Sequence, residues 1–275
     1  MRIATCNVNG IRAAAKKGMG AWLAQTAPDV LLLQEVRAPS DLLPELIGPE
    51  YQIFSEESVI KGRAGVAIAV RNEYEIDPQQ HLVSGLSAGM ADGEAEAPVD
   101  TGRWIELYVP ALDTTFISAY LHSGDAKVAE KMAAKYAHLD RVDLRLAQLR
   151  ERESGHLLMA GDFNIVRSEF DIKNWKPNHN KAAGVLDEEI AYLERWFGEF
   201  GYVDVQRALV GAQVHGPYTW WSQRGQAFDN NVGWRIDYQL TDAALAERAT
   251  TFEIGRAASY DQRWSDHAPL IVDFN

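Results

Sequence analysis

A short apolar segment near the middle of the chain ends in polar residues that could carry out chemistry. His156 to Ala160 is mostly apolar and leads into Gly161-Asp162-Phe163-Asn164. An apolar run of this length bounded by glycine is typical of a buried strand. Because side chains two residues apart in a strand share a face, Asp162 and Asn164 are expected to point at one place. An Asx-turn that merely closes the strand explains this pair equally well.

Four further stretches favour the chemical interpretation. Asn7 lies in an apolar stretch at residues 2–9, and Glu35 follows the aliphatic run at residues 30–33. Asp237 lies in an alternating segment that resembles a strand, and Ser265-Asp266-His267 precedes the last apolar run. Hard oxygen ligands such as Glu35 and Asp266, with the Asn7 amide nearby, suit Mg²⁺ better than zinc.

These residue types fit the hydrolysis of a phosphodiester. That reaction requires neutralisation of charge at phosphate, an oriented water and a stabilised leaving oxygen. His267 beside a carboxylate suits an imidazolium that binds a phosphoryl oxygen. Asp162 is then left to orient or deprotonate the water, and Asn164 to donate to the phosphate. Each residue alone has an ordinary structural explanation, since an Asp-His dipeptide is usually surface chain.

Strands and helices interleave along the chain that must position these residues. Strands are predicted at residues 2–9, 30–35, 103–109, 114–121 and 156–162, and helices at residues 11–25, 128–149 and 188–200. This order predicts an α/β or α+β protein with one domain over residues 1–275. Residues 84–102 contain several acidic residues but no Lys or Arg, which predicts a mobile acidic loop.

The composition is that of an ordinary globular protein. The 275 residues are 47% hydrophobic and 24% charged, with a formal net charge of -12. This charge disfavours broad attraction to nucleic acid or anionic membrane, although it is compatible with a local basic groove. Cys6 is the single cysteine, which excludes a disulfide framework and a cysteine zinc site. No apolar run reaches the length of a membrane span, and a strand is expected from residue 2, so we expect a cytoplasmic protein.

In their order, these motifs resemble the bacterial type of the exonuclease III family, the AP endonucleases of the endonuclease/exonuclease/phosphatase superfamily. The resemblance covers residues 3–274 and rests on Asn7, Gln34-Glu35, Tyr120, Gly161-Asp162-Phe163-Asn164, Tyr218-Thr-Trp-Trp221, Gly233-Trp-Arg-Ile-Asp-Tyr238 and Ser265-Asp266-His267. It implies a four-layer α/β sandwich, in which two mixed sheets pack face to face between helices. The active site is then expected at one end of the sheets.

The resemblance also implies a role for each matching residue. The implied catalytic residues are Asp162, His267, Tyr120, Asn164 and Asp237, with Asp237 as the partner of His267. The implied ligands of Mg²⁺, or of Mn²⁺ as a substitute, are Asn7, Glu35 and Asp266. A second ion, if two act, would recruit Asp162, Asn164 and His267. Substrate binding is implied for Trp220, Trp234, Arg235 and Asn231, with the two tryptophans lining a pocket for an extruded baseless sugar.

The implied function is cleavage of double-stranded DNA on the 5′ side of abasic sites, with 3′→5′ exonuclease and 3′-phosphatase activity at blocked ends. The expected protein is a monomer that associates with the nucleoid when it acts and has no membrane partner. Two departures from the family pattern are expected to change the contacts with the DNA backbone. Ser123 replaces a phosphate-facing amide, and Ala182 replaces an asparagine before an Ala-Gly pair.

Two rival functions remain at this stage. A sphingomyelinase or inositol-phosphate phosphatase belongs to another branch of the superfamily, and a lipid-facing branch would need an apolar hairpin that the sequence lacks. A DNA-binding or scaffold protein with an inactive site is the rival of another class. The acidic net charge gives such a binder little with which to hold phosphate.

Overall fold

The computed structural model describes residues 1–90, 92–152 and 154–275, and within them the strands form two six-stranded sheets and a two-stranded ribbon. The first sheet has the order β13-β14-β1-β2-β4-β3, the second has the order β5-β6-β7-β8-β12-β9, and the ribbon pairs β10 with β11. The strands are β1 (Arg2–Asn7), β2 (Val30–Gln34), β3 (Tyr51–Glu56), β4 (Val66–Arg71), β5 (Leu82–Ser84), β6 (Trp104–Val109), β7 (Thr114–Tyr120), β8 (His156–Asp162), β9 (Val203–Asp204), β10 (Trp220–Trp221), β11 (Gly233–Trp234), β12 (Asp237–Thr241), β13 (Ala249–Ile254) and β14 (Leu270–Phe274). The helices are α1 (Ile11–Lys16), α2 (Met19–Thr26), α3 (Leu43–Ile47), α4 (Pro78–His81), α5 (Leu86–Met90), α6 (Ala129–Arg150), α7 (Trp175–Asn178), α8 (Asp187–Glu194), α9 (Val205–Val210) and α10 (Ala243–Ala246).

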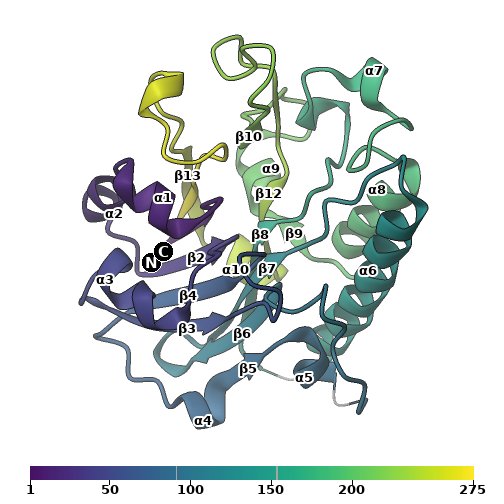
Figure 1. Cartoon of the computed structure of the whole chain (residues 1–275). Coiled ribbons are helices and arrows are strands. Elements are labelled where there is room, and N and C mark those ends of the chain that lie inside the picture. The colour runs from purple at the N-terminus through teal and green to yellow at the C-terminus, as the bar shows by residue number, and fades with distance from the viewer. Residues whose placement is uncertain (91, 153) are drawn as a thin grey trace.

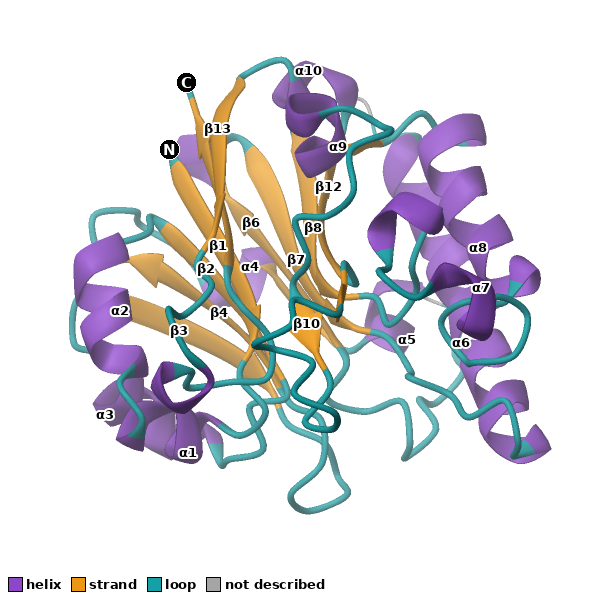
Figure 2. Ribbon diagram, turned by 90° about the horizontal axis from the view of Figure 1, so that it is seen from above, coloured by secondary structure: helices purple, strands orange, loops and turns teal. Residues whose placement is uncertain are grey.

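The two sheets pack face to face, and helices cover their outer faces (Figures 1 and 2). Ile3 and Leu32 of the first sheet belong to the same apolar cluster as Phe116 and Leu158 of the second. The neighbouring positions of the first sheet face outward beneath α1, α2 and α3. Because successive side chains point to opposite faces, a strand covered on both sides must be apolar at nearly every position. This requirement explains the unbroken aliphatic run in β2.

Helices α6 and α8 cover the outer face of the second sheet (Figure 2). Leu139 and Val142 of α6, together with Leu193 of α8, pack in one cluster with Ile117 and Met159 of the sheet. The spacing of the apolar residues in α6 produces the stripe that this packing requires. The predicted four-layer α/β sandwich is confirmed.

The strand pairing brings polar chain positions to one end of both sheets. In the first sheet β1 and β2 are parallel, with Asn7 opposite Gln34, so Glu35 follows directly beside Asn7. In the second sheet β7 and β8 are parallel, and Asp162 lies between Tyr120 and the first residue of the antiparallel β12, Asp237. The β10–β11 ribbon reaches the segment before β14 through an isolated bridge between Trp220 and His267. Figure 1 shows β10 above β12 and β8.

Two local predictions differ from the structure. The helix predicted over residues 11–25 is divided into α1 and α2, because Gly18 has a φ of 107°, in the left-handed region that interrupts a helix. The predicted acidic loop at residues 84–102 contains the helix α5, whose Leu86 and Met90 are buried. Its residue 91 lies outside the described residues, and the mobility of this loop stays a prediction. The single domain also stays a prediction, which the apolar cluster shared by both sheets supports.

None of the helices in the described part of the chain has the length and apolar character needed to cross a membrane.

Candidate active site

Asn7 holds two carboxylates together at the end of the sheets. Its Nδ2 donates to Glu35 Oε1 at 2.8 Å and to Asp162 Oδ2 at 2.9 Å. Its Oδ1 accepts from the backbone N–H of Asn9 at 2.9 Å. In this structure the amide nitrogen of Asn7 positions Glu35 and Asp162, and its amide oxygen already accepts one hydrogen bond. The role of Asn7 as a metal ligand stays a prediction.

Asp237 and His267 form a buried pair next to Asp162. The Nδ1 of His267 lies 2.8 Å from Asp237 Oδ2, and its Nε2 lies 3.7 Å from Asp162 Oδ2. Thr219 fixes the strand start, because its hydroxyl oxygen accepts from the backbone N–H groups of Ile236 and Asp237. Burial alone would lower the pKa of His267, but the charges of Asp237 and Asp162 outweigh burial and raise it to about 10. The imidazole is therefore positively charged at neutral pH.

Asp162 is a buried carboxylate with a strongly perturbed affinity for protons. Burial raises its pKa most, and the charges of Asp237 and Glu35 add to this rise. The charge of His267 and the hydrogen bond from Asn7 act in the opposite direction, and the resulting pKa is about 7. A carboxylate with a pKa near neutrality can accept a proton from water far more readily than an exposed aspartate can.

Gly161 permits Asp162 to sit at this position. Its φ is 147°, and a Cβ atom at this residue would lie 2.0 Å from the carbonyl oxygen of Ala119 in the neighbouring strand. Only glycine allows β8 to approach β7 this closely before the catalytic sequence begins.

Asp266 lies on the opposite side of the site, where two side chains orient it. Asn9 Nδ2 donates to its Oδ1 at 2.8 Å, and Trp220 Nε1 donates to its Oδ2 at 3.4 Å. Burial opposes ionisation of Asp266, but the charge of His267 and these hydrogen bonds hold its pKa below the usual value. Asp266 is therefore a carboxylate at neutral pH.

Tyr120 faces the same carboxylates. Burial, followed by the charges of Glu35 and Asp162, raises its pKa well above the usual value for tyrosine. Its hydroxyl therefore stays protonated and can donate a hydrogen bond. The guanidinium of Arg103 lies over the ring, 4.6 Å from the centroid, which fixes the ring from behind.

Asn164 is held in place by a buried ion pair that the sequence did not reveal. Its backbone N–H donates to Asp162 Oδ1, and its Nδ2 donates to the carbonyl of Leu121, both at 2.9 Å. Its carbonyl accepts from Lys135 Nζ at 3.0 Å. Lys135 is fully buried and pairs with Glu189 at 2.7 Å, so α6 and α8 both support the loop that carries Asn164.

These groups open onto a pocket of about 370 Å³. Trp220 and Trp234 form one wall, packed edge to face with ring centroids 5.5 Å apart. Glu35, Tyr120, Asp162, Asn164, Asp266 and His267 line it, together with Asn9, Arg37, Ser123, Gly124, Ala183 and Ile236. The predicted catalytic residues and both tryptophans thus meet at one cavity, with the exception of Asp237, which is fully buried behind His267.

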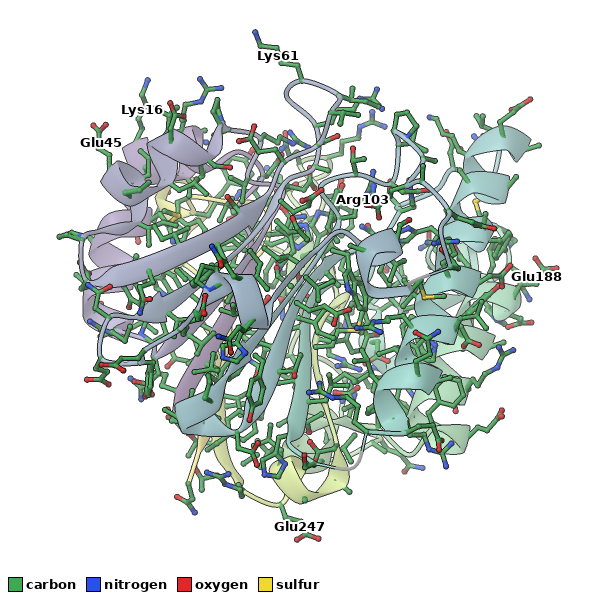
Figure 3. All side chains as sticks on the ribbon, turned by 90° about the horizontal axis from the view of Figure 1, so that it is seen from below. Lys16, Glu45, Lys61, Arg103, Glu188 and Glu247 are labelled. Carbon is green, nitrogen blue, oxygen red and sulfur yellow. The ribbon has the colours of Figure 1, made fainter. Side chains whose placement is uncertain are left out.

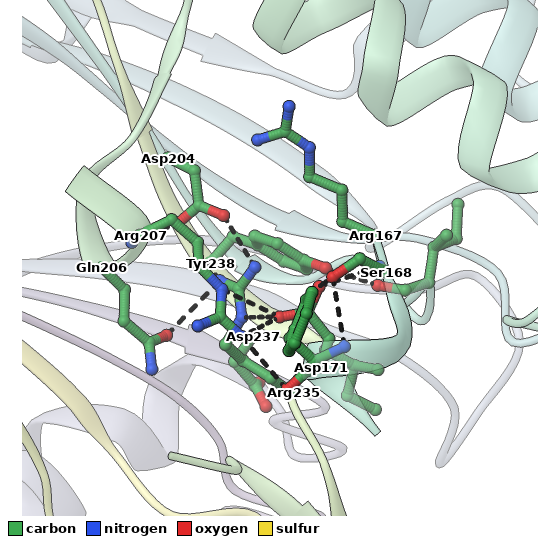
Figure 4. A network of polar contacts seen from close by, with 12 residues as sticks. Arg167, Ser168, Asp171, Asp204, Gln206, Arg207, Arg235, Asp237 and Tyr238 are labelled. Atoms are coloured by element: carbon green, nitrogen blue, oxygen red, sulfur yellow. Dashed lines mark hydrogen bonds and ion pairs between the residues drawn. The ribbon is translucent and has the colours of Figure 1, made fainter. Parts of the chain in front are cut away.

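Two predicted substrate contacts lie elsewhere. Arg235 was predicted to bind substrate, but this is wrong, because its side chain is fully buried and its guanidinium pairs with Asp171 at 2.6 Å and with Asp204 at 2.7 Å (Figure 4). Asn231 is exposed, does not line the pocket, and accepts a hydrogen bond from Trp221 Nε1 at 3.1 Å. Its role in binding substrate stays a prediction.

Two polar residues that line the pocket were not singled out from the sequence. These are Asn9, which contacts Asp266, and Arg37, which contacts Glu35. The alternation of strand side chains offered a signal for Asn9, which lies two residues after Asn7. Arg37 has no such signal, because its side chain reaches Glu35 Oε2 only through a turn in which Glu35 and Arg37 have φ values of 49° and 51°.

The donor set fits a hard divalent cation. Three carboxylates, those of Glu35, Asp162 and Asp266, converge on one pocket, and oxygen donors of this kind suit Mg²⁺. The guanidinium of Arg37 pairs with Glu35 Oε2, so this carboxylate already binds one cationic group. Asp162, Asp237 and His267 also form a group that could hold an ion. The hydrogen bond between Asp237 and His267 makes this second group a less open site for a metal than the three carboxylates are.

A four-layer sandwich that ends in carboxylates and a His–Asp pair is characteristic of metal-dependent hydrolases of phosphate esters. The chain belongs to the Endonuclease/Exonuclease/phosphatase family, which it matches over residues 4–267. It is similar to an exodeoxyribonuclease of Bacillus subtilis, with 31% identity over 279 residues that cover the whole of both chains. It is also similar to exodeoxyribonuclease III of Haemophilus influenzae, with 27% identity over 294 residues and complete coverage of both chains.

A solved structure supports the same grouping. The AP endonuclease of Archaeoglobus fulgidus superposes with a TM-score of 0.81 and 26% identity, covering 100% of this chain and 99% of the other. The family predicted from the motifs is confirmed.

Proposed function

We propose that this protein is a Mg²⁺-dependent DNA-repair phosphodiesterase that cleaves the backbone on the 5′ side of abasic sites. We include in the proposal a 3′→5′ exonuclease activity and the removal of 3′-phosphate ends. One observation carries it, namely that the buried Asp162 and the charged His267 face a pocket with a tryptophan wall. The names of the similar proteins, which are exodeoxyribonucleases and an AP endonuclease, agree with it.

The proposed reaction is the attack of water on a phosphodiester that lies in the pocket. Asp162 accepts a proton from the water, which makes the oxygen a stronger nucleophile. His267 keeps its proton and binds a phosphoryl oxygen, and Asp237 stabilises its charge from behind. Tyr120 and Asn164 line the same pocket and donate hydrogen bonds to phosphate oxygens. The bond between phosphorus and the leaving oxygen then breaks, and the leaving oxygen takes a proton from solvent water. Asp162 returns its proton to solvent, which restores the carboxylate for the next turnover.

Glu35 and Asp266 would hold the Mg²⁺, which would neutralise charge on the phosphate and on the leaving oxygen. Replacement of Glu35 by Gln removes a negative ligand while keeping the side-chain size. We expect the Mg²⁺ concentration for half-maximal activity to rise about tenfold or more in Glu35→Gln. Wild-type activity of this variant at limiting Mg²⁺ would rule out Glu35 as a ligand.

A basic strip beside the pocket supports DNA as the substrate despite the net charge of -12. Arg12, Arg37, Lys61 and Arg63 line an adjoining pocket of about 350 Å³. Figure 3 shows Lys61 on a loop that projects from the body of the molecule, where it could reach a phosphate of a bound duplex. Contacts of this type bind the backbone without reading sequence and weaken as salt increases.

The two tryptophans support an abasic site as the preferred lesion. Extrusion of a nucleotide is least costly where pairing and stacking are already lost, and an aromatic wall suits a sugar without its base.

We further propose that the protein acts as a monomer in the cytoplasm, in contact with the nucleoid. In the described residues the large exposed hydrophobics are Val59, Val99, Leu144, Val214 and Tyr260.

The test is incubation with three labelled duplexes, which carry a single abasic site, a 3′-phosphate, or no lesion. We expect rapid incision of the abasic duplex in Mg²⁺, slower reaction at the other ends, and no reaction in EDTA. Product ends identify the bond that is cleaved. Release of inorganic phosphate without any strand incision would instead make the protein a phosphatase of another branch.

A further inference from the structure

Three potential metal ligands converge outside the active site, from three separate segments. Asp100 precedes β6, His122 follows β7, and His138 lies in α6. Asp100 Oδ1 is 2.6 Å from His122 Nε2 and 3.5 Å from His138 Nδ1. One donor atom of each residue lies within 4.8 Å of the other two. These residues do not line the catalytic pocket.

His138 is the unusual member of the group. Its side chain is 1% exposed, and neither ring nitrogen has a hydrogen-bond partner among the described residues. It points from the buried face of α6 toward His122, with ring centroids 5.1 Å apart and an interplanar angle of 79°. A buried imidazole without a partner is unfavourable, so a ligand that binds its nitrogen would explain its presence.

The donor chemistry differs from that of the catalytic pocket. Two imidazoles and one carboxylate suit Zn²⁺ and related transition ions, whereas three carboxylates suit Mg²⁺. Ligand atoms on one tetrahedral zinc lie about 3.3 Å apart, so the observed separations of 2.6 and 3.5 Å need only small adjustments.

The two arginines near the cluster, Arg103 and Arg141, interact with other groups and not with the two histidines. Arg103 stacks on Tyr120 and donates to the carbonyl of Val99 at 2.8 Å. Arg141 pairs with Asp92 at 3.2 Å and with Glu94 at 2.6 Å. Asp100 therefore remains the carboxylate that faces the two imidazoles, at 17% side-chain exposure.

We propose that Asp100, His122 and His138 form a second metal site, which binds one Zn²⁺-like transition ion. The remaining coordination position is available to water or to a group from outside the cluster. The ion would fasten the acidic segment at residues 92–102 to α6 and to the turn after β7. That turn carries Ser123, which lines the catalytic pocket, so the site supports one wall of that pocket. The inference goes beyond the proposed function and does not depend on it.

The competing interpretation is a plain hydrogen bond between Asp100 and His122 that anchors the loop, with His138 acting only as packing. The two interpretations differ in their response to metal. A packing role predicts no specific zinc binding, and a metal site predicts one tightly bound ion that requires His138.

The test measures zinc binding by the full-length chain after treatment with EDTA and removal of the chelator. Competition with a chromophoric chelator gives the stoichiometry and affinity for Zn²⁺, and the visible absorption of added Co²⁺ reports on the ligand geometry. The measurements use a Glu35→Gln/Asp266→Asn/His267→Ala background, which removes ligands from both ion-binding groups of the catalytic pocket. We expect one Zn²⁺ per chain in this background, with affinity at least 100-fold weaker after His138→Phe.

Further variants keep the result interpretable if one of them folds poorly. Asp100→Asn preserves a hydrogen bond to His122 but removes the negative ligand, and we expect about tenfold weaker zinc binding. His179→Phe is the matched control, because His179 also contacts a carboxylate, Asp187, at 2.6 Å but has no second histidine beside it. This variant should retain wild-type affinity for zinc.

Thermal melting supplies a readout that is independent of activity. Zn²⁺ should raise the melting temperature of the background protein and leave that of His138→Phe unchanged. Without metal, His138→Phe should melt at or above the temperature of the background protein, because it replaces an unpartnered polar ring. Equal zinc stoichiometry with and without His138, or no zinc binding by the background protein, would overturn the proposal.

Discussion

Two buried charged clusters lie on either side of the start of β12, and they differ in their balance of charge. In the structural cluster, Arg207 and Arg235 pair with Asp171 and Asp204, and all four residues are buried (Figure 4). Arg207 also donates to the carbonyls of Gly211, Val214 and Gly216. Each charge in this cluster has a partner, so the cluster has no need of a ligand.

The catalytic cluster is unbalanced by comparison. Its carboxylates are those of Glu35, Asp162, Asp237 and Asp266, and among the described residues the ion pairs of these carboxylates involve two cationic groups, those of His267 and Arg37. The excess negative charge opens onto a pocket instead of being enclosed. Arg235 and Asp237 are only two residues apart, yet one belongs to each cluster. We infer that the compensated charge of the first cluster is structural, and that the uncompensated charge of the second serves the proposed function.

The largest effect is expected in the catalytic cluster, from Asp162→Asn. An amide cannot accept the proton of the attacking water, so turnover should fall by about 10²–10⁴-fold. Binding of an abasic duplex should be retained. Stability should be unchanged or higher, because a carboxyl whose pKa is raised by folding destabilises the fold when it is ionised. Single-turnover cleavage, DNA binding and thermal melting on one preparation measure the three effects, and parallel loss of all three would make Asp162 structural.

The structural cluster should respond in the opposite way, in Asp171→Ala. Removal of this carboxylate leaves two buried guanidinium groups partly uncompensated, which should lower the free energy of unfolding by about 3–5 kcal/mol. Activity per folded molecule should remain close to wild type. Burial opposes ionisation of Asp171, but Arg235 and Arg207 hold its pKa below the usual value. Its contribution to stability is therefore present at neutral pH and lost only in acid.

Glu194→Ala is the control for this experiment. Glu194 pairs with Arg167 at 2.7 Å but is 54% exposed, so its loss should change stability by less than about 1 kcal/mol. Chemical denaturation of the three proteins tests the contrast. Similar losses in Asp171→Ala and Glu194→Ala would remove the distinction between the two clusters.

A third prediction concerns the dependence of activity on pH. Activity should rise as Asp162 loses its proton and fall as His267 loses its proton, near pH 10 in the wild type. Asp237→Asn removes a negative charge that stabilises the imidazolium, so the pKa of His267 falls. The alkaline limb of the profile should then move to lower pH. A profile of kcat/KM from acid to alkaline pH measures this shift. An alkaline limb that does not move would show that deprotonation of His267 does not cause the loss of activity at high pH.

The smallest expected effect concerns the pocket wall. Trp234→Ala removes one apolar contact with an extruded sugar, which should reduce cleavage at an abasic site by about 1–3 kcal/mol. Cleavage of undamaged 3′ ends should fall less. Trp234 is half-buried and packs against Trp220, so it also has a possible role in stability. A depressed melting temperature with uniformly reduced activities would assign Trp234 to the core and not to the pocket.

The residue pattern predicted an interleaved α/β chain, and the family resemblance implied the four-layer sandwich. Apolar runs and helical periodicity predicted β1, β2, β8 and α6, because burial imposes its pattern directly on residue types. Polar residues beside apolar runs singled out Glu35, Asp162 and Asp266, which the structure brings to one pocket. These signals are local in the chain, and the tertiary structure left them unchanged.

Other features were decided by contacts between distant segments. Asn7 became the bridge between Glu35 and Asp162 only because the two sheets, which hold residues over 150 positions apart, meet at their ends. Arg235 lies in a motif that implied a DNA contact, but the fold turns its side chain toward Asp171 and Asp204, over 60 and about 30 residues away. No local pattern indicates which charged partners a buried arginine will find.

Throughout the molecule, features that depend on local sequence were predicted, and features that depend on contacts between distant segments were missed. The sequence predicted most of the buried apolar runs, and it predicted the strands and helices that these runs form. Only the tertiary structure decided which charged side chains are buried and how they pair, as it did for Lys135 with Glu189 beneath Asn164. Burial depends mainly on a residue's own side chain and its near neighbours, whereas pairing depends on geometry set by the whole fold.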